Sequence, residues 1–371
     1  MKRVIISGGG TGGHIYPAIT IAKAMAELEP TEILYVGTKN GLESTLIPKE
    51  GIPFMTLDIK QGLQRKLSWQ NVITIEKAVS SIWKASAILK KFDPHIVVGT
   101  GGYVCGPMLM AAAMHRIPTL IQEQNVIPGI TNTILSKFAT VVAVGYEEAK
   151  GKFGGKESVV VTGNPVRKDI LTATKEEGCR QLGIRPDVFT VLVAGGSRGA
   201  RTINTAMVEV HHYFKNDEHI QILHVTGSNE FERVKEELKE VGDDGWYGKS
   251  SCILPYLYNM PAALAAADLA VFRAGAVGLA ELTVRGVPAI LIPYPYAAED
   301  HQTYNAQALV HNGAAKMIVD KMLTAKELIQ EFQELRNNPE VLQKMSLASR
   351  KMGRPEAAYD IARLAFSIAK K

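Results

Sequence analysis

The sequence predicts an α/β protein with two doubly wound parallel sheets, and three observations lead to this prediction. Short apolar segments of the length of buried strands alternate with longer segments of helical periodicity. This alternation starts twice, at residues 4–6 and 190–194, and each time the apolar segment runs into a glycine-rich turn. The chain has 371 residues, more than one hydrophobic core usually organises, so two domains are expected.

The predicted strands follow one another in two series. The segments that predict them are 4–6, 33–37, 96–99, 118–121 and 141–144 in the first series, and 190–194, 222–225, 269–272 and 289–292 in the second. The turn-forming cluster Gly163-Asn164-Pro165 separates the series, which predicts an N-terminal domain over 1–164 and a C-terminal domain over 165–349. The tail beyond about residue 340 has helical character.

The composition is that of a globular protein, with 46% hydrophobic and 21% charged residues. No apolar segment is long enough to span a bilayer, and the N-terminus lacks the apolar stretch of a signal peptide, so we expect neither membrane spanning nor export. The three cysteines, Cys105, Cys179 and Cys252, are far apart, which excludes a disulfide scaffold and a CxxC zinc site and suits a reducing cytoplasm.

The formal net charge is +5, and the whole excess lies in the first half of the chain. Residues 1–164 contain 17 basic and 12 acidic side chains, whereas the remainder contains 25 of each. Within this half, residues 72–92 predict a helix with apolar side chains at helical spacing and lysines between them. A core-facing helix with a solvated back and a helix on an anionic membrane surface both fit this pattern.

The first glycine turn, Gly8-x-Gly10-x-x-Gly13, matches the dinucleotide-binding fingerprint. The end of the second predicted strand, residues 37–40, lacks the acidic residue that would hold the ribose of NAD, which argues against an NAD site. Five glycines in one turn indicate that another group approaches the backbone closely. His14 follows the turn at the edge of the sheet where catalytic groups gather, although a surface histidine fits equally well.

Polar residues of the second half follow two predicted strands. Glu281 lies near the start of a predicted helix, where it either stabilises the helix dipole or accepts hydrogen bonds from ribose hydroxyls. Residues 300–305 form a polar cluster, which is either a solvated loop or a site for sugar hydroxyls.

These motifs together resemble a known family. The segments that carry the resemblance are 9–18, Gly101-Gly102-Tyr103-Val104-Cys105-Gly106-Pro107, Glu123-Gln124-Asn125, Gly163-Asn164-Pro165-Val166-Arg167, 195–200 and 273–281. In order and spacing they resemble the MurG family of glycosyltransferases, which form lipid II in peptidoglycan synthesis. The match covers nearly the whole chain.

The resemblance implies a GT-B architecture of two Rossmann-like domains facing each other across a cleft, with a C-terminal helix of about residues 350–371 packing back on the N-terminal domain. It implies inverting transfer of N-acetylglucosamine from UDP-GlcNAc to the C4 hydroxyl of the muramoyl sugar of lipid I, undecaprenyl-pyrophosphoryl-MurNAc-pentapeptide, with release of UDP. The implied location is the cytoplasmic face of the cell membrane, as a peripheral protein on its anionic surface. No cofactor and no nucleic acid are implied.

The family's functional residues carry over by position. The residues implied to bind the donor are Thr11, Gly12, Gly13, Asn125, Arg167, Ser197, Ala276, Val277, Glu281 and Gln302. Those implied to bind the acceptor pyrophosphate are Gly10, Gly13, Gly101, Gly102 and Tyr103. The sequence departs from the family at Val277-Gly278, where Thr is common, and at Gln122, where His is frequent.

The reaction needs a base for the acceptor proton and a group to stabilise the departing UDP. His14 is the first candidate for the base, and Glu123 is either the second candidate or the group that orients His14. No Asp-x-Asp motif is present, so we expect no metal, and Arg167, Ser197 and helix N-termini are left to stabilise the leaving group.

Two other functions remain open on the sequence. A UDP-GlcNAc 2-epimerase would share the fold and the donor site but needs no lipid acceptor, so the basic first half counts against it. A non-catalytic nucleotide-sugar-binding module at the membrane would not need His14, Glu281 and Gln302 together.

Overall fold

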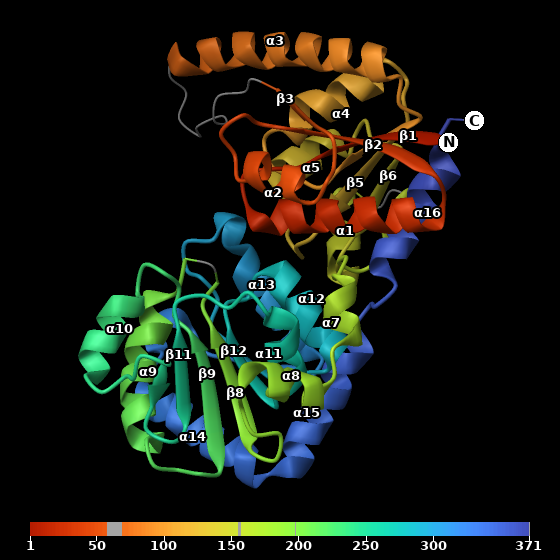
Figure 1. Cartoon of the computed structure of the whole chain (residues 1–371). Helices are drawn as coiled ribbons and strands as arrows, with labels where there is room; N and C mark the ends of the chain where they lie inside the picture. The colour runs from red at the N-terminus through yellow and green to blue at the C-terminus, as the bar shows by residue number, and fades with distance from the viewer. Residues whose placement is uncertain (58–68, 155–156, 197, 371) are drawn as a thin grey trace. The chain divides into compact units, whose positions relative to one another are not determined.

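The structure is a computed structural model that describes residues 1–57, 69–154, 157–196 and 198–370, with only the helical backbone over 69–79. The chain folds into two compact units (Figure 1). Unit 1 comprises Met1–Val166 and Glu356–Lys371, and unit 2 comprises Arg167–Pro355.

Unit 1 is built on a sheet of seven parallel strands in the order β3-β2-β1-β4-β5-β6-β7. Its strands are β1 (Lys2–Ser7), β2 (Thr31–Gly37), β3 (Phe54–Thr56), β4 (Ile96–Gly99), β5 (Thr119–Glu123), β6 (Val141–Val144) and β7 (Val159–Val161). Its helices are α1 (Gly12–Leu28), α2 (Glu43–Lys49), α3 (Trp69–Phe92), α4 (Cys105–Met114), α5 (Ile130–Leu135), α6 (Glu147–Lys150), the 3-10 turn η1 (Gly151–Phe153) and α16 (Ala357–Ile368).

Unit 2 has seven strands in the order β10-β11-β9-β8-β12-β13-β14, parallel except for β10 at the edge. Its strands are β8 (Phe189–Ala194), β9 (Ile220–Val225), β10 (Trp246–Tyr247), β11 (Ser251–Leu254), β12 (Leu269–Phe272), β13 (Ala289–Leu291) and β14 (Ala315–Met317). Its helices are α7 (Lys168–Thr172), α8 (Lys175–Leu182), α9 (Arg201–Phe214), α10 (Phe231–Leu238), α11 (Met260–Ala266), α12 (Ala276–Arg285), α13 (His301–His311), α14 (Ala325–Asn337) and α15 (Pro339–Met352), with 3-10 turns η2 (Ala298–Asp300) and η3 (Asp320–Met322).

The predicted fold class is confirmed in both units. In unit 1 the first strand, β1, lies between β2 and β4, and in unit 2 the first strand, β8, lies between β9 and β12, so each sheet reverses its strand order beside its first strand, as Rossmann-like doubly wound sheets do. All nine strands expected from the sequence are present. The strands that the sequence did not predict, β3, β7, β10, β11 and β14, have two to four residues each and carry too short an apolar signal.

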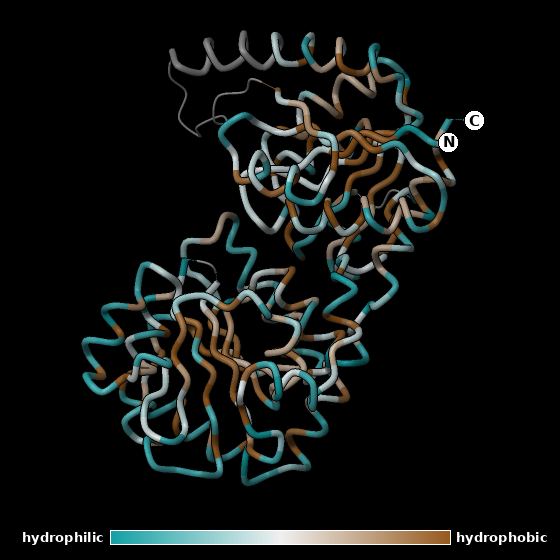
Figure 2. Tube along the Cα trace, in the orientation of Figure 1, coloured by the Kyte–Doolittle hydropathy of each residue, from teal (hydrophilic) through white to brown (hydrophobic). Residues whose placement is uncertain are grey.

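The central strands of both units are coloured as hydrophobic (Figure 2), as is typical of parallel sheets that are buried on both faces. In unit 1, Ile96 and Val98 of β4 join the core formed with α1 and α16. Gly99, the residue after Val98, faces the opposite side of the sheet, where a Cβ atom would lie 2.4 Å from Leu109 of α4. The last helix, α16, packs beside α1 and contributes Ile361 and other buried residues to this core (Figure 1).

The arrangement of strands brings the glycine-rich turns together in each unit. In unit 1, the turns that follow the neighbouring strands β1 and β4 meet at the carboxyl edge of the sheet. In unit 2, β8 and β12 are neighbouring parallel strands, so the turns that follow them lie at the same edge of the sheet. This edge, where the strand order reverses, is where open α/β sheets bind their ligands.

Candidate active site

The two glycine turns of unit 1 lie backbone against backbone. The Gly9 N–H donates a hydrogen bond to the Gly101 carbonyl oxygen at 3.3 Å. A Cβ atom at Gly102 would lie 2.3 Å from the Gly9 oxygen, and φ at Gly102 is +82°. Only glycine therefore fits this position, and the close approach within the protein explains part of the glycine content that the sequence left open.

His14 lies in the first turn of α1, against the second glycine turn. Its Nδ1 atom lies 3.0 Å from the Thr100 carbonyl oxygen and 3.0 Å from Oε1 of Gln124. The Thr100 hydroxyl donates to the carbonyl oxygen of His14, which holds the backbone of the same residue. A Cβ atom at Gly101 would come within 2.7 Å of Nδ1, so a glycine is needed beside the ring.

These contacts fix which nitrogen of His14 carries the proton. A carbonyl oxygen can only accept, so Nδ1–H is the donor to Thr100 and the ring is held as the Nδ1–H tautomer when neutral. The lone pair is then on Nε2, which makes no hydrogen bond within the residues that the structure describes. The imidazole is thereby prepared to take a proton at Nε2, as a general base requires.

The amide of Gln124 is itself oriented by a buried polar network. Its Nε2 donates to the Thr100 carbonyl oxygen at 2.7 Å and to the side-chain oxygen of Gln122. Asn164 accepts from the Gln122 amide at 3.0 Å and donates to the Gln124 carbonyl oxygen at 2.9 Å. With its nitrogen committed to these acceptors, Gln124 must present its oxygen to His14.

Glu123 does not orient His14. Its Oε1 accepts from the backbone and side-chain nitrogens of Asn125 at 2.9 and 3.2 Å, and its Oε2 accepts from the Gly129 N–H at 3.1 Å and Asn132 at 2.8 Å. Four donors on a side chain that is 1% exposed fill the lone-pair positions of the carboxylate. Glu123 thus holds the loop that carries Asn125, and the orienting role expected for it falls to Gln124 and Thr100.

The residues predicted to bind the acceptor pyrophosphate lie together in unit 1, with one qualification. The Tyr103 ring lies over Gly10, where a Cβ atom would be 3.5 Å from Cε1. The Gly10 N–H donates to the Glu43 carboxylate and the Gly101 N–H to the Cys105 sulfur, so neither is offered to a ligand. Gly12 and Gly13 open α1, and their N–H groups lie in its first turn, where a helix has no partners of its own.

In unit 2, Ser197 lies outside the described residues, so its predicted role has no structural description. The rest of its turn is anchored to the end of β9. A Cβ atom at Gly199 would lie 2.1 Å from the Thr226 carbonyl oxygen, and one at Gly227 would lie 2.3 Å from the Gly199 nitrogen. Backbone again approaches backbone through glycine.

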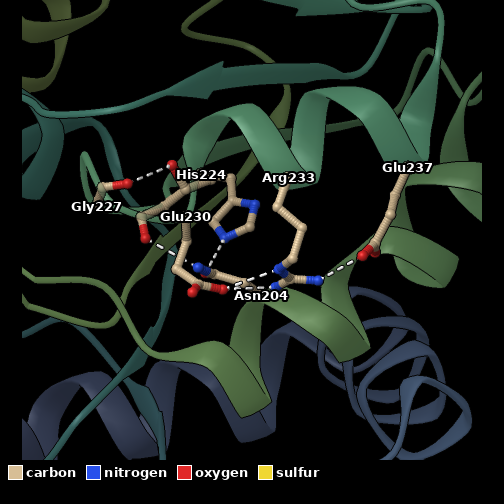
Figure 3. A network of polar contacts seen from close by, with 7 residues as sticks. Asn204, His224, Gly227, Glu230, Arg233 and Glu237 are labelled. Atoms are coloured by element: carbon tan, nitrogen blue, oxygen red, sulfur yellow. Dashed lines mark hydrogen bonds and ion pairs between the residues drawn. The ribbon is translucent and has the colours of Figure 1, made fainter.

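A buried polar network fixes this anchor (Figure 3). Asn204 of α9 donates to the Thr226 carbonyl oxygen at 2.9 Å and accepts from Nε2 of His224 at 3.0 Å. His224 Nδ1 then accepts from Nε2 of His211, whose Nδ1 lies 2.8 Å from the Ser251 hydroxyl. Burial lowers the pKa of His224 to about 3 and that of His211 well below its usual value, so both rings are neutral.

Arg167 and Glu281 form a charged pair in unit 2. Their closest atoms are 3.7 Å apart, and the Glu281 side chain is 13% exposed. Burial raises the pKa of Glu281 to about 7, Arg167 opposes this rise, and Asp169 adds to it. Arg167 also lies 3.7 Å from Asp169 and is one-third exposed, so its guanidinium is placed to meet a ligand anion.

Two side chains of α13 form hydrogen bonds to the backbone just before α12. Gln302 accepts, through Oε1, from the Ala274 N–H at 3.1 Å and the Tyr294 N–H at 3.0 Å. Asn305, completely buried, donates to the Ala274 carbonyl oxygen at 3.2 Å. The Gln302 oxygen is thus occupied while its amide N–H groups make no hydrogen bond within the described parts of the chain. Helix α12 begins at Ala276, so the N–H groups of Ala276 and Val277 lie in its first turn.

The predicted donor residues fall in both units. Thr11, Gly12, Gly13 and Asn125 lie in unit 1, and Arg167, Ala276, Val277, Glu281 and Gln302 lie in unit 2. Among the described residues, no three His, Cys, Asp or Glu side chains are grouped so that they could hold a metal ion. The described groups placed to meet anionic oxygens include the N–H groups that open α1 and α12 and the Arg167 guanidinium.

Sequence reasoning did not assign a role to four residues that position these groups. Glu43, Gln124, Asn164 and Asn305 are buried polar side chains whose partners are backbone or other buried groups. Gln124 and Asn164 stand inside the motifs of the resemblance, and this was the only signal for them. Nothing in the local sequence distinguishes Glu43 from a surface glutamate.

Two Rossmann-like units, each with paired turns at the carboxyl edge of its sheet, define a GT-B protein, and comparison with known proteins gives its family. Residues 4–144 match the glycosyltransferase family 28 N-terminal domain, and residues 190–361 match the glycosyltransferase family 28 C-terminal domain. The chain belongs to glycosyltransferase family 28 and is a glycosyltransferase.

Individual relatives of this chain have a more specific name than the family. A protein of Desulforamulus reducens named UDP-N-acetylglucosamine–N-acetylmuramyl-(pentapeptide) pyrophosphoryl-undecaprenol N-acetylglucosamine transferase is 51% identical over 97% of this chain and 96% of its own length. A protein of the same name from Thermoanaerobacter sp. is 48% identical over 99% of this chain and 100% of its own. The predicted resemblance to the MurG family is confirmed.

Solved structures agree with the fold. MurG of Acinetobacter baumannii matches with a TM-score of 0.78 and 29% identity, covering 99% of this chain and 100% of its own. The UDP-GlcNAc 2-epimerase of Neisseria meningitidis, solved with UDP-GlcNAc bound, matches with a TM-score of 0.69 at 15% identity, covering 99% of this chain and 100% of its own. At 15% identity, the similarity to the epimerase shows a shared fold only.

Proposed function

We infer that the protein transfers N-acetylglucosamine from UDP-GlcNAc to the muramoyl sugar of lipid I, forming lipid II and UDP. Identity of about half over the full length to transferases with this name supports the reaction. The observation that carries the chemistry is His14, whose Nδ1–H is committed to Thr100 and Gln124 and whose Nε2 is left to take a proton.

In the proposed reaction, His14 Nε2 takes the proton of the C4 hydroxyl of the acceptor, and the oxygen of this hydroxyl attacks the anomeric carbon of UDP-GlcNAc. The bond from that carbon to the UDP oxygen breaks, and the anomeric centre inverts. The charge that develops on UDP is stabilised by Arg167 and by the N–H groups that open α12, which are donors already in place before the reaction. Glu281 accepts hydrogen bonds from the ribose.

The sugar is held by amide groups in this proposal. The N–H groups of Gln302 face a donor hydroxyl because its oxygen is occupied by Ala274 and Tyr294. Asn125 is held by Glu123, which explains why a buried carboxylate stands beside a sugar-binding amide. Glu123 then acts as a positioning residue.

Product analysis separates this function from the epimerase. The protein is incubated with UDP-GlcNAc alone and with UDP-GlcNAc plus a lipid I analogue. The proposal predicts UDP release and a disaccharide product only when the acceptor is present. Formation of UDP-ManNAc from UDP-GlcNAc alone would support the epimerase, and tight UDP-GlcNAc binding with no turnover in either mixture would support a binding module.

We further propose that unit 1 rests on an anionic membrane surface through α3, α4 and α5, which pack in sequence. Among the residues described there, the exposed apolar side chains are Trp83, Met114, Ile130, Ile134 and Phe138. Exposed basic side chains stand among them at Lys84, Lys90, Lys91, Arg116 and Lys137. In the described chain no helix is both long and apolar enough to cross a bilayer. Part of the apolar and basic pattern predicted for 72–92, including Val72, Ile75, Lys77 and Val79, lies outside the described side chains.

Trp83 gives this surface its test, because 74% of its side chain is exposed. The protein should bind vesicles containing anionic lipid, and the binding should weaken as salt rises, since each basic residue near such a surface contributes about 1 kcal/mol. Trp83→Ala should reduce binding, whereas Tyr213→Ala, an exposed aromatic residue of unit 2, should not. Equal binding to neutral and anionic vesicles would contradict the electrostatic part.

A further inference from the structure

A completely buried carboxylate, Glu43, supports the first glycine turn from beneath. Glu43 is the first residue of α2 and has no exposed surface. Its Oε1 accepts from the Thr38 N–H at 3.0 Å and the Thr38 hydroxyl at 2.6 Å, and its Oε2 accepts from the Gly10 N–H at 3.2 Å. Among the described residues, no Lys, Arg or His lies within ion-pair distance of it.

Three glycines make room for this side chain. A Cβ atom at Gly9 would lie 2.6 Å from Oε1 of Glu43, and one at Gly41 would lie 2.3 Å from the same atom. A Cβ atom at Gly37 would lie 2.6 Å from Cγ of Glu43. Glycines in three separate segments therefore leave the space that the buried Glu43 side chain fills, whereas a glutamate on the surface would need no such space.

Burying the Glu43 carboxylate without a neighbouring cation costs free energy. An ionised carboxylate placed in a protein interior without a cation loses its hydration and recovers only what its hydrogen bonds supply. All three partners of Glu43 are donors, which is the arrangement that a carboxylate satisfies and a neutral side chain does not. Burial is the main cause that raises the pKa values of Tyr35 and Cys105, and the nearby Glu43 carboxylate adds to both shifts.

We propose that Glu43 is a positioning residue for the glycine turn of unit 1 and, through it, for His14. It turns the Gly10 N–H inward, at φ = +87°, while Tyr35 donates to the Gly8 oxygen and Gly9 donates to Gly101. Each glycine that precedes α1 is thus fixed by one hydrogen bond from a different element. Helix α1 therefore begins at Gly12, and this start sets where His14 stands.

The proposal also states which donors the turn offers to an acceptor phosphate, and this part rests on the proposed function. Because Gly10 gives its N–H to Glu43, the N–H groups of Gly12 and Gly13 at the start of α1 remain for the acceptor. The hydrogen-bond partners of Glu43 are Gly10 and Thr38, so it acts on His14 through the turn and not by direct contact.

Glu43→Gln tests the proposal with almost no change of shape. A carboxamide has one accepting oxygen, so its NH2 group must face either the Gly10 N–H or the Thr38 N–H, donor against donor. We expect the KM for a lipid I analogue to rise, or kcat to fall, by roughly 10- to 100-fold, the range for losing a hydrogen bond to a charged group. The affinity for UDP, assigned to unit 2, should stay within twofold.

Thr38→Val is the matched control, because it removes the hydroxyl donor and leaves the contact between Glu43 and Gly10 in place. It should keep KM and kcat within about threefold. Equal effects of the two variants, or wild-type kinetics in a folded Glu43→Gln protein, would overturn the proposal.

Amide hydrogen exchange over residues 8–14 gives a readout that does not depend on the reaction. Glu43→Gln should speed exchange in this segment by roughly tenfold or more, while Thr38→Val leaves it unchanged. If wild-type protein transferred no sugar but the exchange result held, the proposed function would fail and the positioning role would stand. Unchanged exchange in Glu43→Gln would overturn the positioning role.

Discussion

The Nδ1 atom of His14 lies 3.0 Å from the carbonyl oxygen of Thr100, an atom that can only accept a hydrogen bond. The contact joins the first turn of α1 to the turn that follows β4. The packing of β1 against β4 therefore determines which tautomer of His14 is present. The amide of Gln124 adds a second acceptor at the same distance. A histidine held in this way has one nitrogen left for chemistry, and the identity of that nitrogen is set before any substrate binds.

The role of Gln124 can be tested by removing its acceptor. Gln124→Met keeps the bulk of the side chain but loses both the oxygen that accepts from His14 and the amide nitrogen that donates to Thr100 and Gln122, so we expect kcat to fall by at least about tenfold. UDP affinity should not change. Steady-state kinetics with a lipid I analogue and calorimetric titration of UDP give the two quantities.

Gln122→His is the comparison for this change, since it places in this chain the residue that is frequent in the family; it alters one partner of the Gln124 amide but keeps the Gln124 oxygen and its bond to Thr100. Its kcat should stay within about threefold of wild type. A Gln124→Met protein with unchanged kcat would show that Thr100 alone suffices to hold the ring.

The proposed contact between Glu281 and the ribose predicts that donor binding depends on pH. Its pKa of about 7 means that the carboxylate is ionised above neutrality and protonated below it. Since the ionised form accepts hydrogen bonds from ribose hydroxyls more strongly, the KM for UDP-GlcNAc should rise as the pH falls from 8 to 6. Glu281→Gln should raise the KM and remove this pH dependence. A wild-type KM that stays level from pH 6 to 8 would argue against the assigned contact.

The same residue predicts a gain in stability on substitution. Folding raises the pKa of Glu281, so its contribution is fully favourable below its ordinary value of 4.5 and is lost as the pH rises through about 7. At pH 8, the free energy of unfolding of Glu281→Gln should therefore exceed that of wild type by up to roughly 2–3 kcal/mol. The variant should accordingly unfold at a higher urea concentration. At pH 4.5 the difference should nearly vanish. A variant that is less stable than wild type at pH 8 would contradict this account.

Backbone N–H groups, rather than a side chain, are expected to hold the UDP diphosphate at α12. Ala276→Pro removes the first N–H and suits the extended backbone of Gly275 before it, with ψ at 131°, so the helix should persist. UDP affinity should fall by about 1.5–3 kcal/mol. Gly278→Thr introduces the side chain common in the family without a clash, since a Cβ atom there would lie 3.8 Å from the Phe272 ring, an ordinary van der Waals contact.

For Gly278→Thr, the KM for UDP-GlcNAc should stay within a few-fold of wild type. Calorimetric titration of UDP into both variants, with circular dichroism to verify folding, gives the comparison. A large gain in affinity with Thr, or no loss with Pro in a folded protein, would assign the diphosphate to side chains.

The histidine network of unit 2 predicts acid sensitivity. His224 has a pKa of about 3 in the folded protein, whereas an unfolded histidine titrates near its ordinary value of 6.5. Its contribution to stability is therefore present above pH 6.5 and is lost as the pH falls toward 3. His224→Gln should lose less stability than wild type between pH 7.5 and 5, measured by hydrogen exchange in β9. His219→Gln, at an exposed position, should behave as wild type, and identical slopes for all three proteins would contradict the prediction.

The sequence predicts the frame of the molecule better than its inner polar contacts. The apolar segments of β1, β4, β8 and β12 are detectable because parallel strands are buried on both faces, and their glycine turns mark the edge where ligands bind. The short strand β3 at the edge of its sheet carries too few residues for a periodic signal.

The site shows the same limit. His14 could be placed from its position after a glycine turn, but its partner could not, because Gln124 reaches it across 110 positions of sequence. Glu123 was assigned to catalysis or to orienting His14 because carboxylates often do both. Its four donors come from residues 125–132, and only the folded loop reveals that they converge on it.

The most direct test of the account is transfer of labelled N-acetylglucosamine from UDP-GlcNAc to a lipid I analogue by wild type and by His14→Ala, measured together with UDP affinity. We predict that wild type forms the labelled disaccharide, that the variant is slower by roughly 10²- to 10⁴-fold, and that both bind UDP equally. Near-normal transfer by a folded His14→Ala protein would contradict the assignment of the base, and no transfer by wild type would contradict the function itself.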